Sequence, residues 1–265
     1  MGMAETETIS HKARVQDQFG ATAAAYVASA GHAAGDDLAQ LVAWAEGGPE
    51  KAALDVATGG GHTALALAAH YGRVVASDLT APMLAAAEGF IRGKGIANVE
   101  FRLADAEALP FGDAEFDAVS CRIAPHHFPA PARFVAEVAR VLKPGGLFLL
   151  EDSVVPENPA LDAFVNRAEA LRDNTHMRSL SEAEWRGMIE AVGLRVEATT
   201  IYPKPHPFDD WVGRSRTSDE DLTALTAHFR AASPAAREVF AIEYDDAGRV
   251  TTFTDEKILL KARKA

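Results

Sequence analysis

The first half of the chain alternates short apolar runs with longer stretches in which apolar residues recur every three or four positions. Five runs have the length of strands and span residues 53–57, 74–78, 99–103, 116–121 and 147–150. The stretches between them that have a helical period begin near Thr63, Thr80 and Pro131. This alternation is typical of βαβ units. We therefore predict an α/β fold, a doubly wound and mostly parallel sheet with helices on both faces.

The second half of the chain carries a different pattern. A helix is expected over 158–172, and Ser181 and Glu184 have the spacing of a capping box at the start of another, which Gly193 ends. The elements expected after it are a strand at 194–202, a polar stretch at 203–210, a helix at 219–232 and a strand from 250 to about 260. A strand, a helical cap insertion and a returning strand predict an antiparallel final strand that closes one end of the sheet.

Composition narrows the class of protein. The 265 residues are 48% hydrophobic and 24% charged, which is typical of a globular chain. Asp and Glu number 38 against 26 Lys and Arg, and the net charge of −12 disfavours DNA or RNA as a partner. The single cysteine, Cys121, excludes an internal disulfide and a cysteine-based metal site and fits a reducing cytoplasm.

The N-terminus has neither the basic start nor the apolar core of a secretory signal. No apolar run approaches the roughly 20 residues needed to cross a bilayer. We therefore expect a cytoplasmic location and no membrane span.

The run LDVATGGGHT at 54–63 reads as a strand, a glycine turn and the start of a helix. Glycines allow a tight bend, and the N–H groups at a helix N-terminus favour a negative group. Asp78 ends the next strand about twenty residues later, where a carboxylate can accept both hydroxyls of a ribose. Alone, each feature is equally a plain turn or a capping residue. Together they predict a nucleoside site, without separating a nicotinamide from an adenosyl cofactor.

A third motif separates the two cofactors. Asp105 lies in ADAEALPF after the third strand, where its carboxylate can accept from an adenine amino group. FDAVSC at 116–121 and RVLKPGG at 140–146 follow it. With these five ordered motifs, residues 54–152 resemble the class I S-adenosylmethionine (SAM)-dependent methyltransferases, in the small-molecule branch near the ubiquinone/menaquinone-biosynthesis enzymes. The resemblance implies a Rossmann-like fold and transfer of a methyl group from SAM to a small-molecule acceptor by in-line displacement.

The resemblance also implies cofactor contacts. Asp55 would hold the methionine amino end through water, and Gly59 and Gly61 would let the backbone approach the methionine. Asp78 would bind the ribose. The remaining implied contacts are Leu79 and Met83 along the adenosine, Asp105 and Ala106 at the adenine, and Cys121 to Ile123, including Arg122, beneath the sulfonium. The family usually has glycine at Ala57, so this residue must take a negative φ or suffer strain.

By the same resemblance, residues 1–48 form a helical lid, 49–153 the SAM-binding core and 154–265 a helical cap with the closing strands of one domain. Tyr26 would close the cofactor pocket, with Phe19 behind it. The alternative is an Ala-rich helix that packs its aromatic residues in the core.

Methyl transfer needs alignment and exclusion of water, and it needs a general base only where the acceptor loses a proton. His126 and His127 follow the fourth strand at the predicted ligand-binding edge, and a histidine side chain ordinarily titrates near neutral pH. Packing beside the cofactor or capping a helix would explain them too. Asp152 is a further candidate. His176 and Arg178 could bind an acidic or phenolic acceptor, or lie in a solvated loop. The histidines fit no metal signature, so no metal is expected.

Two other functions remain open. A NAD-dependent oxidoreductase would explain the glycine turn but not the setting of Asp105 or the KPGG turn. A non-catalytic SAM-binding protein would keep Asp55, Asp78 and Asp105 without an acceptor cavity. The acceptor atom (O, N, C or S) and the oligomeric state, a homodimer included, are not determined by the sequence.

Overall fold

The computed structural model describes residues 3–28 and 35–265 and, within the first helix, the side chains of 6–23 and 27. Seven strands form the main sheet in the order β3-β2-β1-β4-β5-β9-β7. Their bounds are β1 Gly48–Val56, β2 Tyr71–Asp78, β3 Val99–Leu103, β4 Phe116–Arg122, β5 Leu142–Val155, β7 Leu194–Pro207 and β9 Val250–Lys264. The first five strands are parallel, and β9 runs antiparallel to both β5 and β7. The predicted fold class is confirmed.

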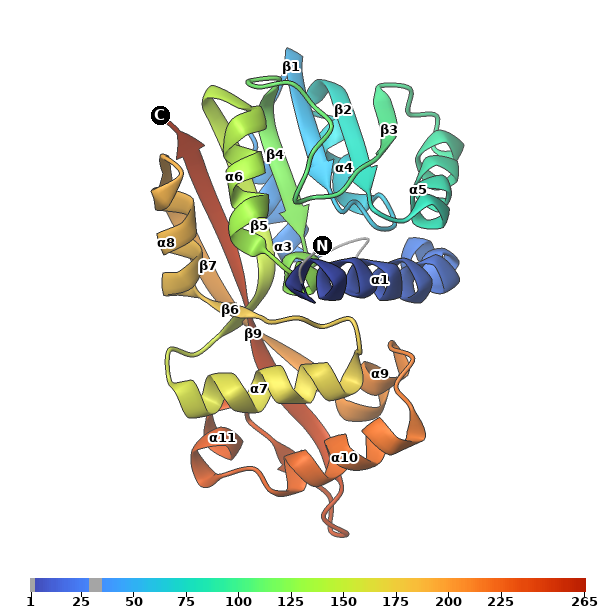
Figure 1. Cartoon of the computed structure of the whole chain (residues 1–265), viewed down its shortest axis with the longest axis vertical. Helices are drawn as coiled ribbons and strands as arrows, with labels where there is room; N and C mark the ends of the chain where they lie inside the picture. The colour runs from blue at the N-terminus through green and yellow to red at the C-terminus, as the bar shows by residue number, and fades with distance from the viewer. Residues whose placement is uncertain (1–2, 29–34) are drawn as a thin grey trace.

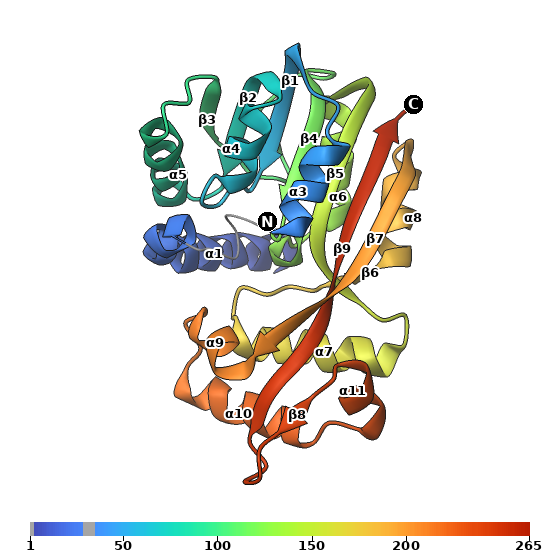
Figure 2. The same cartoon turned by 180° about the vertical axis from the view of Figure 1, so that it is seen from behind.

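Helices cover both faces of the sheet. On one face α6 (Pro131–Val141) and α8 (Glu182–Ala191) pack against β1, β4 and β5, and Trp185 is buried there (Figure 1). The helices of the other face are α3 (Asp36–Trp44), α4 (His62–Ala68) and α5 (Ala81–Gly93) (Figure 2). The strands between them read as continuous apolar runs because both of their faces are buried.

A second lobe forms where β5, β7 and β9 extend past the core lobe (Figures 1 and 2). Its helices are α7 (Pro159–Arg172), α9 (Phe208–Gly213), α10 (Asp219–Arg230) and α11 (Pro234–Val239). Trp211, Phe229 and Phe253 belong to its separate hydrophobic core. Two short strands add to the sheet, β6 (Leu180–Ser181) beside β5 and β8 (Glu243–Tyr244) beside β9.

Most local signals in the second half are confirmed, and one is wrong. Ser181 and Glu184 form the predicted capping box. The polar stretch 203–210, expected to lie between the strand at 194–202 and the inserted helices, instead continues β7 to Pro207 and enters α9 at Phe208. The main sheet ends at β7, which pairs with β9 on one side only, and an edge strand tolerates prolines because their missing N–H groups need no partner on the open side.

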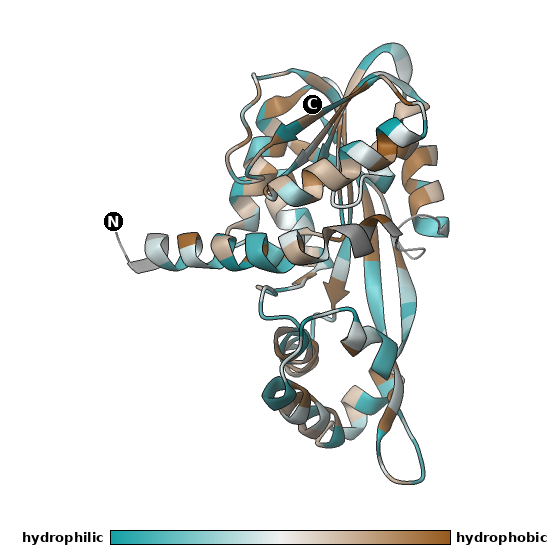
Figure 3. Cartoon of the chain, turned by 90° about the vertical axis from the view of Figure 1, so that its right-hand side faces the viewer, coloured by the Kyte–Doolittle hydropathy of each residue, from teal (hydrophilic) through white to brown (hydrophobic). Residues whose placement is uncertain are grey.

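The long helix α1 (Met3–Ala28) lies across the edge of the sheet at which the parallel strands end (Figure 1). It packs against α5, and polar and apolar residues are interspersed along it (Figure 3). The short helix η1 (Pro125–His127) follows β4 and contacts α1. Among the described helices, none is both long enough and apolar enough to span a bilayer.

Candidate functional site

Asp78 connects the two motifs of the predicted nucleoside site. Its Oδ2 accepts from the backbone N–H of Gly59 at 3.0 Å, and its Oδ1 accepts from the N–H of Thr80 at 2.9 Å. Burial raises the pKa of Asp78, while these backbone donors favour the charged form. The glycine turn and the end of β2 therefore form one structural unit, as their spacing predicted.

Asp55 lies at the end of β1 beside that turn. Its carboxylate accepts from the hydroxyls of Thr58 at 2.6 Å and Ser120 at 2.7 Å. Burial raises the pKa of Asp55 to about 6 in spite of these two donors. A small cleft of about 50 Å³ opens next to it, lined by Asp55, Ala57, Thr58, Gly59, Gly60, His62, Thr63, Arg122 and Ile123.

The residues of the glycine turn have different roles. Ala57 has a φ of +53°, so the strained alternative holds at this position. A Cβ on Gly59 would meet nothing within 4 Å, which leaves its backbone open to close approach. A Cβ on Gly61 would lie 2.9 Å from Ile91 of α5. Gly61 therefore permits helix packing, and it is Gly60 that lines the cleft instead.

Asp105 follows β3 and is joined to α1. The ammonium of Lys12 lies 2.6 Å from Asp105 and 2.6 Å from Glu107. Ala106 and Met83 are buried, and the carbonyl of Leu79 accepts from Gln16 Nε2 of α1 at 3.0 Å. The sequence did not indicate Lys12, because a lysine on an exposed-looking helix gives no sign of what the helix covers.

Arg122 lines the cleft at the end of β4, and its guanidinium is paired with carboxylates of β5 and α3. Its Nε donates to Glu151 at 2.6 Å, and it also pairs with Asp37 of α3. Burial raises the pKa of Glu151 to about 7, and Tyr202 donates to the same carboxylate at 2.5 Å. This buried set joins α3 and β7 to the core lobe, and sequence reasoning missed all of it except Arg122.

The N-terminal contact predicted for Tyr26 concerns a side chain outside the described residues. Phe19 lies about two turns earlier in α1, with its ring edge-on to His127 at a centroid distance of 5.0 Å. His11 Nε2 donates to the carbonyl of His127 at 2.9 Å. Helix α1 therefore rests on η1 as well as on Asp105.

The three predicted histidines come together below α1. His126 Nδ1 lies 2.6 Å from Asp152 Oδ1, and its ring is 4.1 Å from that of His127 and 5.7 Å from that of His176. Burial opposes the charged ring of His126, but the carboxylate of Asp152 outweighs it and raises the pKa of His126. Asp152, from β5, is the partner that sequence reasoning offered as a further candidate.

The other two histidines are held neutral. Burial and the neighbouring His126 lower the pKa of His127, whose Nδ1 faces the carbonyl of Thr175 at 2.9 Å. Burial also lowers the pKa of His176, to about 4. His126 is therefore the histidine of the three whose surroundings favour proton uptake. Arg178 lies apart from this group, because it pairs with Asp162 at 2.7 Å and Glu184 at 2.6 Å.

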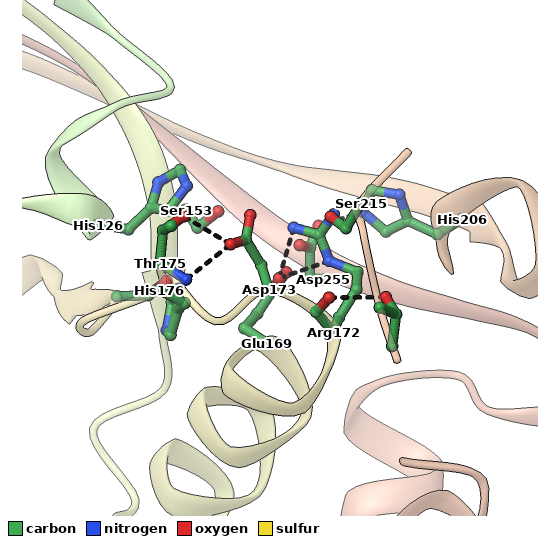
Figure 4. A network of polar contacts seen from close by, with 12 residues as sticks. His126, Ser153, Glu169, Arg172, Asp173, Thr175, His176, His206, Ser215 and Asp255 are labelled. Carbon is green, nitrogen blue, oxygen red and sulfur yellow. Dashed lines mark hydrogen bonds and ion pairs between the residues drawn. The ribbon is translucent and has the colours of Figure 1, made fainter. Parts of the chain in front are cut away.

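Further buried charges surround these histidines (Figure 4). Glu169 pairs with Arg172 at 2.8 Å, and Lys257 donates to Asp255 at 2.8 Å and Ser153 at 2.7 Å. The only signal in the sequence was polar residues in an apolar final strand, which is equally compatible with an exposed face. Among the described residues, no group of three or more His, Cys, Asp or Glu side chains is placed to hold a metal ion.

A larger hollow, of about 420 Å³, lies elsewhere. It opens on the outside of the core lobe between α8 and β7, where Glu182, Arg186 and Thr199 contribute to its lining. None of the predicted site residues lines it. The chemistry-bearing residues therefore gather at the carboxyl edge of the strands.

Known proteins are similar to this chain in sequence and in fold. A family model described as a methyltransferase domain matches residues 54–150. YcgJ of Bacillus subtilis, named an uncharacterized methyltransferase, is 38% identical over 88% of this chain and 92% of its own length. The chain belongs to the methyltransferase family. It is a SAM-dependent methyltransferase, as the resemblance of residues 54–152 predicted.

Other relatives extend this assignment. The crystal structure of YcgJ has a TM-score of 0.84 and covers 86% of this chain and 98% of its own. A Bacillus halodurans structure described as a methyltransferase is 43% identical with a TM-score of 0.84, over 87% of this chain and 99% of that one. A demethylmenaquinone methyltransferase of Clavibacter sepedonicus is 41% identical over 69% of this chain and 74% of its own length.

Proposed function

We propose that this methyltransferase binds SAM at the carboxyl edge of β1, β2 and β3 and transfers its methyl group to a small molecule. The observation that carries the proposal is the junction of Asp78 with the backbone of Gly59 at 3.0 Å, beside the buried Asp55. Carboxylates at neighbouring strand ends suit the amino group, ribose and adenine of the cofactor. SAM supplies an activated methyl group, so the protein has mainly to align it and exclude water.

In this proposal each carboxylate binds one part of the SAM molecule. Asp55 holds the methionine amino group, Asp78 the ribose hydroxyls and Asp105 the adenine amino group. The other proposed contacts are the backbone of Ala57, Gly59 and Ala106, and the side chains of Tyr26, Leu79, Met83 and Arg122. Gly61 supports the turn by packing on α5.

Helix α1 is the proposed lid, within residues 1–48, over the core at 49–153. The cleft beside Asp55 is far smaller than the roughly 300–1,000 Å³ of typical ligand sites. Lys12 lies on the carboxylate intended for the adenine. Admission of SAM therefore requires α1 to move, and the ion pairs of Lys12 are among the contacts that change.

The methyl acceptor enters from the side of the cap at 154–265, next to the histidines. We assign the general base to His126, because Asp152 holds its Nδ1 proton and leaves Nε2 free of that bond. His127 and His176 shape the same site as neutral rings. The relative named demethylmenaquinone methyltransferase supports a small-molecule acceptor by its name.

Calorimetric titration of the full chain with SAM, and separately with NAD, tests the cofactor assignment. We expect SAM to bind and Asp78→Ala to weaken it about 100-fold or more, since two hydrogen bonds to a charged group are lost. Asp113→Ala is the matched control, because the Asp113 side chain is 81% exposed and has no part in the proposed site. Binding of NAD in place of SAM, or unchanged SAM affinity in Asp78→Ala, contradicts the proposal.

Turnover separates an enzyme from a non-catalytic SAM-binding protein. Formation of S-adenosylhomocysteine is measured over a set of small-molecule acceptors. We expect His126→Ala to lower turnover far more than SAM affinity, since the ring acts on the acceptor. Equal losses in both would make His126 a packing residue.

A further inference from the structure

The acceptor side of the site is a buried polar cluster where the two lobes meet. Its members come from η1, β5, α7, the loop after α7 and β9, and we name it the junction cluster: His126, Asp152, Glu169, Arg172, Asp173, His176, Asp255 and Lys257 (Figure 4). Asp152 is 1% exposed and His176 is 8% exposed. Buried polar atoms usually have partners, so those without one indicate what could bind.

The tautomer of His176 follows from Asn166. The amide nitrogen of Asn166 donates to Asp162 at 2.5 Å and to the carbonyl of Ser179 at 3.1 Å. Its Oδ1 accepts from the N–H of Ser179 at 2.7 Å, which fixes the orientation of the amide. Because His176 Nε2 lies 2.9 Å from this oxygen, Nε2 carries the proton. The neutral ring therefore has a bare lone pair at Nδ1.

Two atoms of the cluster accept hydrogen bonds and have no partner among the described residues. They are His176 Nδ1 and Asp152 Oδ2, and both are fully buried. His126 adds a third acceptor, since its Nδ1–H donates to Asp152 Oδ1 and leaves a lone pair on Nε2. The rings of His126 and His176 are 5.7 Å apart, close enough for one small molecule to reach both.

The charges of the cluster point the same way. Arg172 is paired with Glu169 at 2.8 Å and Lys257 with Asp255 at 2.8 Å, so each cation already faces a carboxylate. Asp152 and Asp173 add negative charge, and the neutral ring of His126 does not offset it. An anionic acceptor would meet this excess of carboxylates, and Arg178, the cation that sequence reasoning offered to it, is paired with Asp162 and Glu184.

We propose that the methyl acceptor is a small molecule without negative charge whose O–H or N–H groups donate to His176 Nδ1, Asp152 Oδ2 and His126 Nε2. This rests on the proposed function and names its acceptor class. In the transfer, the acceptor oxygen or nitrogen forms a bond to the methyl carbon and the carbon–sulfur bond breaks with its electron pair left on sulfur. The acceptor proton passes to His126 Nε2, and Asp152 stabilises the imidazolium.

Three probes built on the same ortho-dioxygenated benzene ring separate the effect of hydrogen-bond donors from the effect of negative charge. Catechol has two hydroxyls, 1,2-dimethoxybenzene has none, and 3,4-dihydroxybenzoate has both hydroxyls and a carboxylate. Their binding to the full chain saturated with S-adenosylhomocysteine is measured by NMR titration of the histidine ring protons. We expect catechol to bind about 100-fold tighter than the dimethoxy compound and at least about tenfold tighter than the benzoate. Equal or tighter binding of the benzoate, or no binding of catechol at millimolar concentration, overturns the proposal.

A charge-removing variant tests the same point within the protein. Asp152→Asn removes a negative charge and can place an amide N–H donor at the position of the Oδ2 acceptor. The preference for catechol over 3,4-dihydroxybenzoate should therefore shrink at least about fivefold. Asp113→Asn makes the same chemical change at an exposed ion pair and should keep the wild-type preference. An unchanged preference in Asp152→Asn contradicts the assignment of Oδ2.

Nitrogen-15 NMR of the histidine rings needs no acceptor. We expect a protonated Nε2 and a bare Nδ1 at His176, and a protonated Nδ1 at His126. A protonated Nδ1 at His176 would place a donor in the site and overturn the proposal. Calorimetry with SAM distinguishes a failure of the proposed function from a failure of the proposed acceptor class. If SAM does not bind, the proposed function is wrong. If SAM binds but the tautomer of His176 or the probe preference differs from the expectation, only the acceptor class is wrong.

Discussion

Acidification should weaken SAM binding through Asp55. This carboxylate is buried at the end of β1, and burial raises its pKa to about 6. In the proposed complex it faces the cationic amino group of SAM, and only its ionised form attracts that group. The affinity should therefore be constant at high pH and fall once the pH drops below this pKa.

The expected size follows from the pKa. Protonation multiplies the apparent dissociation constant by about 1.1 at pH 7 and by about 11 at pH 5, a tenfold loss over two pH units. In Asp55→Asn this dependence disappears. The variant should also bind SAM about 10- to 100-fold more weakly at neutral pH, because a hydrogen bond to a charged group contributes roughly 1.5–3 kcal/mol.

Calorimetric titration with SAM between about pH 5 and pH 8 measures both effects, with circular dichroism to show that the chain stays folded. Asp113→Asn, which removes an exposed carboxylate, should keep the wild-type profile. If the tenfold loss persists in Asp55→Asn, another group governs the pH dependence and the amino group does not rest on Asp55.

Three further predictions concern stability, measured by chemical unfolding. Ala57→Gly should raise the free energy of unfolding by about 0.5–1 kcal/mol, because glycine relieves the strain of a φ of +53°. Ala114 has the same φ in an exposed turn, so Ala114→Gly should raise it similarly without changing SAM affinity. A loss of stability in both variants would refute the strain argument. Gly61→Ala should cost about 2–4 kcal/mol, because its Cβ would lie 2.9 Å from Ile91 at a φ of +84°, and a cost below about 1 kcal/mol would contradict that packing. His176 has its pKa lowered to about 4 by burial, so the unfolded chain binds a proton more readily and stability falls as the pH drops from about 6.5 toward 4. His176→Gln should remove up to about 3 kcal/mol of this fall, and an equally steep loss in the variant would assign it to other groups.

The sequence by itself determined the alternating strands and helices and the edge of the sheet at which the candidate cofactor motifs gather. These features follow from local properties. The hydrophobic period reports whether a segment is a strand or a helix, and parallel strands necessarily end at one edge. Asp55, Asp78 and Asp105 could therefore be placed at or just after strand ends in advance, and the start of α8 was recognisable from Ser181 and its capping box.

Only the tertiary structure decided which of these groups meet and which are charged. Lys12 reaches Asp105 across 93 residues, and His126 reaches Asp152 across 26. Such pairs carry no local signal, because a side chain's partner and burial depend on how whole elements pack. The same holds for the contact of Gly61 with α5, because a Cβ on this glycine would lie 2.9 Å from Ile91 and nothing in the local sequence indicates that contact. The hydrophobic period of a segment specifies whether it forms a helix or a strand. The pKa of a buried histidine and the orientation of its lone pair depend instead on the partners and the burial that it acquires when distant segments pack around it.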